Sequence, residues 1–136
     1  MLLAIDVGNT NITLGLYSGD VLGPRWRLAT VHDRMPDEYG LQFLGLIHHA
    51  GFQPQDLTGA CLASVVPPLT GKVIEACRNY LGQDPLVVDA GVKTGVRIRY
   101  EDPRAVGADR IVDAAAVLRF YGAPACVVDF GTATTF

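Results

Sequence analysis

The sequence lacks any uninterrupted apolar segment of the roughly 20 residues that are needed to cross a bilayer. The first apolar stretch is interrupted at Asp6, and no basic segment precedes it, so no secretory signal peptide is predicted. Basic residues are also few, since 11 Lys and Arg against 14 Asp and Glu give a net charge of −3. Because a general nucleic-acid-binding protein normally carries a basic face, we expect neither a nucleic-acid nor a membrane partner.

Cysteine is scarce as well. Cys61, Cys77 and Cys126 are odd in number and far apart, with no Cys-x-x-Cys pair and no Cys/His cluster. This pattern predicts neither a zinc site nor a disulfide framework. Cys61 and Cys126 lie in apolar runs that are typical of strands, so we expect reduced core thiols in a cytoplasmic protein.

The glycine-rich motifs of common nucleotide-binding folds are also missing. No Gly-x-Gly-x-x-Gly occurs, and Gly71-Lys72 lacks both the earlier glycine and the following Ser or Thr of a P-loop. A dinucleotide-binding fold therefore has no support. The histidines offer no better motif: His48 and His49 fall at the expected end of a helix and His32 in a polar loop, so we expect no metal role for them.

What the sequence does contain is a turn motif that occurs twice. Residues 2–17 are predicted to form two short strands around a polar turn, in which an apolar run ends at Asp6 and is followed by Gly8. Residues 125–136 repeat this design, since their apolar run ends at Asp129 and is followed by Gly131. Asn9, Thr10 and Asn11 follow Gly8, and Thr132, Thr134 and Thr135 follow Gly131.

Such a turn places a carboxylate beside N–H and O–H donors, which suits Mg²⁺ and phosphate. Gly8 would allow a positive φ or a close approach of the backbone to a ligand. Either copy alone could be an ordinary polar hairpin turn. The recurrence favours two related lobes, each of which offers one phosphate-facing turn.

Hydrophobic periodicity and punctuating Gly and Pro residues predict the remaining elements. We expect strands at 21–30, 57–66, 86–88 and 96–100, and helices at 36–51, 69–81 and 107–121. This order predicts an α/β fold with a mixed sheet and helices, resembling one lobe of the actin-like ATPase (ribonuclease H-like) fold. Residues 1–124 would form that lobe, and residues 125–136 would begin a second lobe. Since no returning strand follows the second turn, we expect the chain to be a piece of a longer protein.

Three motifs together resemble one family. Asp6-Val7-Gly8-Asn9-Thr10, Gly107-Ala108-Asp109-Arg110 and Asp129-Phe130-Gly131-Thr132 closely resemble the type III pantothenate kinases. The resemblance covers the whole chain and about the first half of such an enzyme. It implies transfer of the γ-phosphoryl group of ATP to pantothenate, giving 4′-phosphopantothenate in the first step of coenzyme A biosynthesis.

The resemblance also implies the site residues. Asp109 would accept the hydroxyl proton, Asp129 would bind a monovalent cation (K⁺ or NH₄⁺), and Asp6 would hold Mg²⁺ through water. The implied substrate-binding residues are Tyr100, Gly107, Ala108, Asp109 and Arg110. The implied ATP-binding residues are Asp6, Val7, Gly8, Asn9, Thr10, Asn11, Ile12, Thr13 and Thr132.

The full-length enzyme would be a homodimer, and the first half alone would be inactive or nearly so, because the second half supplies much of the adenosine site. Asp102 departs from the Asn that relatives commonly show before Pro103.

Two other functions stay open from the residues alone. A kinase or phosphatase of the same superfamily that acts on a sugar or polyphosphate would use Asp6 and Asp129 equally well, and the Gly107–Arg110 motif is what favours pantothenate. A non-catalytic, ATP-binding accessory factor for transcription would not depend on Asp109. A fragment with only structural interest is the third possibility.

Overall fold

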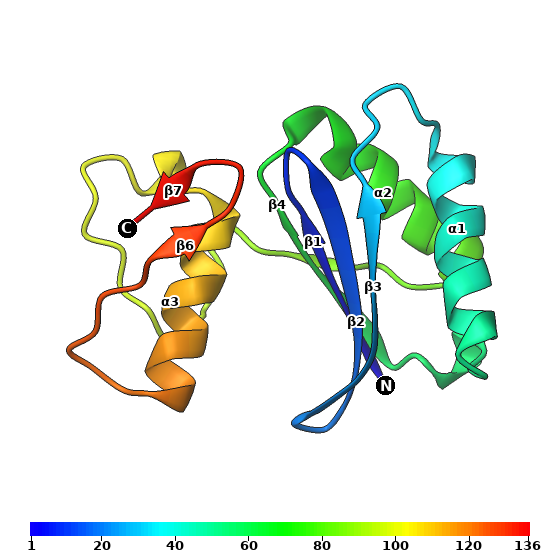
Figure 1. The fold of residues 1–136 in the computed structure, drawn as a ribbon, viewed down its shortest axis with the longest axis horizontal. Helices are drawn as coiled ribbons and strands as arrows, with labels where there is room; N and C mark the ends of the chain where they lie inside the picture. The colour runs from blue at the N-terminus through cyan, green and yellow to red at the C-terminus, as the bar shows by residue number, and fades with distance from the viewer. The chain divides into compact units, whose positions relative to one another are not determined.

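The computed structural model describes residues 1–136. The chain divides into two compact units, Met1–Val87 and Val88–Phe136, which are described separately. Figure 1 traces both units along the chain. None of the helices has the length and apolar character that a membrane crossing requires. The predicted lobe boundary after residue 124 stays a prediction.

A five-stranded mixed sheet organises the first unit. Its strands are β1 (Leu2–Val7), β2 (Asn11–Ser18), β3 (Val21–Ala29), β4 (Gly59–Ser64) and β5 (Leu86–Val87). They lie in the order β3-β2-β1-β4-β5. Strand β2 is antiparallel to both β3 and β1, and β4 is parallel to both β1 and β5. The predicted α/β fold with three antiparallel strands at the start of a mixed sheet, as in an actin-like ATPase lobe, is confirmed.

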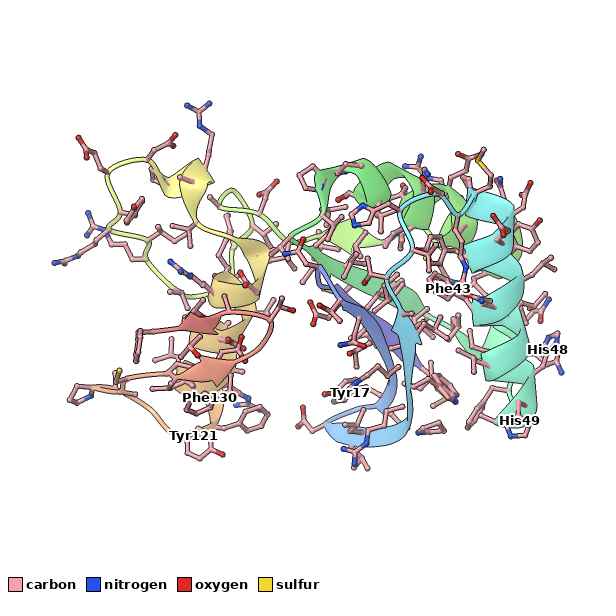
Figure 2. All side chains as sticks on the ribbon, turned by 45° about the horizontal axis from the view of Figure 1, so that its top comes forward. Tyr17, Phe43, His48, His49, Tyr121 and Phe130 are labelled. Atoms are coloured by element: carbon pink, nitrogen blue, oxygen red, sulfur yellow. The ribbon has the colours of Figure 1, made fainter.

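Two helices supply the other half of this unit's core. They are α1 (Pro36–His49) and α2 (Pro67–Leu81), which pack against each other beside the sheet (Figure 1). Alternate residues of β1 are fully or almost fully buried, as period-2 patterning requires, and they join residues from both helices in one cluster. Phe43 of α1 belongs to this cluster, whereas His48 and His49 are exposed at the end of the same helix (Figure 2).

The start of α2 corrects the sequence prediction. We expected Pro67-Pro68 to end a strand and the helix to begin at Leu69, but α2 begins at Pro67 itself. Proline is tolerated in a first turn, because the N–H groups there have no partner within the helix. The helix ends at Leu81, and the φ of 64° at the following Gly82 fits a glycine cap.

The second unit contains little regular structure. It comprises a short 3₁₀ turn (Pro103–Ala105), α3 (Ala108–Phe120), β6 (Asp129–Phe130) and β7 (Thr134–Thr135). The strand expected at 96–100 is absent, and the apolar run 125–128 is not a strand either. Neither segment has a neighbouring strand in this unit, and an extended segment without a partner forms no ladder.

Few side chains of this unit are buried. Its buried apolar residues are Val88, Ala108 and Ile111, whereas Leu118 of α3 is 46% exposed. Tyr121 and Phe130 are both more than 80% exposed, and Figure 2 shows both on the surface of the unit. The unit therefore lacks the apolar burial that stabilises an independent domain.

Candidate active site

The first predicted phosphate turn lies between β1 and β2 in the first unit. The antiparallel register places Asp6 opposite Thr13 and Val7 opposite Ile12. Val7 and Ile12 are completely buried, whereas Asp6 and Thr13 are exposed. Directly opposed residues project to the same face of a sheet. The carboxylate and the hydroxyl therefore share the face that does not pack against the core.

Backbone hydrogen bonds hold this turn in one shape. The N–H of Gly8 donates to the carbonyl oxygen of Asn11 at 2.9 Å. Thr30, just after β3, donates through its hydroxyl to the carbonyl oxygen of Gly8 at 2.7 Å and through its N–H to that of Thr10 at 2.9 Å. A third strand thus braces the turn from outside. The side chains of Asn9, Thr10 and Asn11 remain exposed.

The role of Gly8 differs from one of the two that we expected. Its φ is not positive, so left-handed backbone does not explain the glycine. A Cβ at this position would lie 3.2 Å from the carbonyl oxygen of Asn11, which is closer than nearly all real Cβ contacts. Close backbone approach within the turn is therefore what favours glycine here.

The predicted substrate motif begins α3 in the second unit. Gly107 is the N-cap, and the Asp109 carboxylate accepts a hydrogen bond from the N–H of Arg110 at 2.8 Å. The N–H groups of a helix start carry partial positive charge, so an acid there is stabilised. The guanidinium of Arg110 makes no hydrogen bond or ion pair to another side chain. It is therefore available to an anionic ligand.

Arg110 lines a pocket of about 280 Å³ whose lining residues all belong to the second unit. The pocket brings the predicted residues Arg110 and Asp129 together. Its lining residues are Arg110, Asp113, Ala114, Ala125, Cys126, Val127, Asp129, Thr135 and Phe136. Among these, the charged side chains are one cation and two carboxylates.

The other predicted substrate and phosphate residues of this unit do not line the pocket. Tyr100 is 61% exposed in the loop before α3, and Ala108 is buried. Thr132 is exposed in the bend between β6 and β7. The binding roles of these residues stay predictions.

Sequence reasoning missed Asp113. Burial raises the pKa of its carboxyl above the ordinary value, and the negative charges of Asp129 and then Asp109 raise the pKa further. Asp113 follows Asp109 by four residues, so both side chains lie on one face of α3. That spacing was readable in the sequence, but an acid on a helix is usually solvated, and only the pocket distinguishes this one.

Few potential metal ligands lie close together in this structure. The described residues contain no group of three or more His, Cys, Asp or Glu side chains that could hold a metal ion. The exposed carboxylate of Asp6 and the hydroxyl of Thr13 fit Mg²⁺ only if phosphate oxygens and water complete the shell, which is how Mg²⁺ usually binds. Asp129 likewise offers oxygen ligands without a closed cage.

Comparison with known proteins adds the family. The family model for type III pantothenate kinase matches residues 2–136. The chain belongs to the type III pantothenate kinase family. Three proteins named type III pantothenate kinase are similar over its length: 55% identity for that of Moorella thermoacetica, 48% for that of Halalkalibacterium halodurans and 48% for that of Dehalococcoides mccartyi.

Those matches cover 99–100% of this chain but only 54%, 54% and 52% of the three relatives. The chain therefore spans about half the length of the type III pantothenate kinases that it matches. Within that half, the first unit carries the turn around Gly8, and the second unit carries both the helix start at Asp109 and the pocket beside it.

Proposed function

We propose that the full-length protein transfers the γ-phosphoryl group of ATP to the primary hydroxyl of pantothenate, giving 4′-phosphopantothenate in the first step of coenzyme A biosynthesis. The observation that carries this proposal is the pair Asp109–Arg110 at the start of α3. It sets a hydrogen-bond acceptor, Asp109, next in sequence to Arg110, whose unpaired guanidinium belongs to a residue that lines the pocket, in a chain of this family. Asp109 itself does not line that pocket.

Arg110 binds the substrate in this proposal. A guanidinium makes paired hydrogen bonds to a carboxylate, and pantothenate carries one. Tyr100, Gly107 and Ala108 line the rest of the substrate site. The exposure of the Tyr100 ring and the position of Gly107 and Ala108 at the helix start support these roles, since helix starts favour anions.

Asp109 orients the reacting hydroxyl. One oxygen of its carboxylate accepts the N–H of Arg110, which fixes the side chain and leaves the other oxygen for the hydroxyl. A carboxylate is a weak base toward an alcohol, so the proton moves to Asp109 late, as the bond to phosphorus forms. Orientation of the nucleophile is then its main contribution.

ATP phosphates bind at the braced turn. The segment from Asp6 to Thr13 and the hydroxyl of Thr132 contact them, and Asp6 holds Mg²⁺ through water. Asp129 binds K⁺ or NH₄⁺. These cations neutralise phosphate charge in the site. The shape of the turn, fixed by Thr30 and Asn11, supports this role because a preorganised site needs no rearrangement during the reaction.

The full-length enzyme is a cytoplasmic homodimer in this proposal. The free thiols of Cys61, Cys77 and Cys126 fit a reducing compartment, and the homodimer rests on the resemblance to the family. The boundary of the two lobes after residue 124 rests on the repeated turn motif.

A coupled assay of ADP release tests the reaction. The full-length protein, its mass verified, is assayed with ATP, Mg²⁺ and K⁺, with and without pantothenate, and residues 1–136 are assayed beside it. We expect pantothenate-dependent ADP release from the full-length protein and none from residues 1–136. ADP release that responds to a sugar or polyphosphate but not to pantothenate would contradict the proposal.

A further inference from the structure

Asp113 is the one carboxylate of the pocket to which no role has been assigned. It lies in the second turn of α3, one turn after Asp109 and three residues after Arg110. Residues at these spacings share a helix face. Asp113 lines the pocket together with Arg110 and Asp129. Its position therefore continues the substrate motif one turn further into the helix.

The carboxylate of Asp113 has no hydrogen-bond donor among residues 1–136. It makes no hydrogen bond and no ion pair to the described residues, although it is partly buried. Arg110 lies three residues away but does not pair with it. A partly buried carboxylate without donors is costly. A ligand that donates a hydrogen bond to Asp113 would offset that cost.

The pocket also offers hydrogen-bond donors and acceptors on different side chains, which suits a ligand with an acceptor at one end and donors elsewhere. Arg110 supplies donors only, and Asp113 as a carboxylate supplies acceptors only. Pantothenate carries a carboxylate at one end, and an amide N–H and a secondary hydroxyl nearer the reacting hydroxyl. The pocket volume of about 280 Å³ lies just below the range of small-molecule pockets, about 300 to 1,000 Å³.

We propose that Asp113 is a substrate-binding residue that accepts a hydrogen bond from the amide N–H or the secondary hydroxyl of pantothenate. This inference rests on the proposed function and adds to it an acceptor that recognises the middle of the substrate. Asp113 takes no part in proton transfer, because Asp109 already faces the reacting hydroxyl. It acts equally on bound substrate and transition state, so its removal weakens binding of pantothenate more than turnover.

The test compares Asp113→Ala and Asp113→Asn with the wild-type full-length enzyme. Asp33→Asn is the matched control, because Asp33 is an exposed acid outside the second unit. We expect Asp113→Ala to raise the pantothenate KM about 10- to 100-fold, the usual effect of losing a hydrogen bond to a charged group. Asp113→Asn keeps an acceptor oxygen and should raise it less. The ATP KM and kcat should stay within about twofold in both variants.

A second measurement follows binding of pantothenate in the pocket without any catalytic turnover. Cys126 is an exposed thiol that lines the same pocket, so bound pantothenate should slow its alkylation by iodoacetamide. Asp113→Ala should need about 10-fold more pantothenate for the same protection, with no ATP present. Circular dichroism and the unfolding midpoint of each variant establish that it is folded.

An unchanged pantothenate KM in Asp113→Ala would overturn the inference while leaving the proposed kinase intact. A fall in kcat together with a rise in both KM values and a lower unfolding midpoint would also overturn it, because Asp113 would then be structural. A wild-type enzyme that does not phosphorylate pantothenate would overturn the proposed function first, and this inference with it.

Discussion

The ring of Tyr80 in α2 lies so close to Gly40 in α1 that a Cβ on Gly40 would be 2.1 Å from Cδ2 of the ring. The hydroxyl of the same tyrosine donates to Oδ1 of Asp37 at 2.9 Å, so both ends of the ring are held. The glycine and the tyrosine together set how closely the two helices approach. That approach buries the α1 and α2 faces that complete the core above the sheet.

Gly40→Ala should destabilise the first unit. The added methyl group must displace a ring that is packed and hydrogen-bonded, and overpacking of this kind costs about 1–3 kcal/mol. Gly45→Ala in the same helix is the matched control, since a Cβ there meets no atom within 4 Å and should stabilise the helix by up to about 1 kcal/mol. Urea unfolding of both variants measures the difference. Equal free energies of unfolding for the two would show that Tyr80 yields freely.

Tyr80→Phe should change how stability depends on alkaline pH. The hydrogen bond to Asp37 raises the pKa of Tyr80 above its ordinary value of 10.0, and burial adds to the shift. The folded state thus favours the protonated phenol, and this contribution is fully present below pH 10 and lost as the pH rises through the raised value. The advantage of wild type over Tyr80→Phe should therefore be largest at pH 8 and smaller at pH 11. Urea titrations at the two pH values measure it, and a constant difference would contradict the assignment.

Tyr39→Phe should loosen the loop before α1. The completely buried Tyr39 donates its hydroxyl to the carbonyl oxygen of Val31 at 2.7 Å and accepts the N–H of the same residue at 3.1 Å. Removing the oxygen leaves both backbone groups without that partner, at a cost of about 1–3 kcal/mol. Faster amide exchange at Val31 should accompany the loss of stability. Tyr17→Phe, at a half-buried tyrosine, should change neither quantity.

The three thiols should react at very different rates. Burial raises the pKa of Cys77 to about 12 and also raises that of Cys61, whereas Cys126 is exposed. Only the thiolate attacks an alkylating reagent. A buried thiol therefore reacts slowly for two reasons: its raised pKa leaves little thiolate, and the reagent reaches it poorly. At pH 8 we expect one rapid modification per chain, located at Cys126 by mass spectrometry. Cys126→Ser should abolish the rapid phase, and rapid labelling of Cys77 would mean that the first unit opens readily.

The sequence predicted the first unit well because its signals are local. Alternation of apolar and polar residues in 2–7 decides which face is buried, and the capping glycine at 82 marks the end of α2. The second unit was harder for a physical reason. The segment 125–128 is as apolar as a strand, but a strand exists only beside a partner, and no partner for it is present in this unit.

The candidate site divides in the same way. Asp6, Asp109 and Asp129 stand out in the sequence because each ends an apolar run or lies in the first turn of a helix close to a glycine; their roles stay predictions. Asp113 carries no such motif, and the pocket that gives it meaning is built partly from residues 125–129, more than ten positions away. The hydrogen bond by which Thr30 holds the first turn could not be predicted from the sequence either, because it depends on the register of β2 with β3.

Asp109→Asn should leave the site assembled but nearly inactive in the full-length enzyme. The Asn side chain keeps an oxygen that can accept the N–H of Arg110, so the start of α3 and the position of the guanidinium are preserved. It cannot take up the hydroxyl proton, and loss of a general base usually lowers kcat by about 10²- to 10⁴-fold. The affinity for ATP, measured by calorimetry, should be unchanged, since the substitution alters none of the residues proposed to contact ATP. Asp33→Asn controls for the loss of one negative charge. Near-normal kcat in Asp109→Asn would remove Asp109 from the role of proton acceptor.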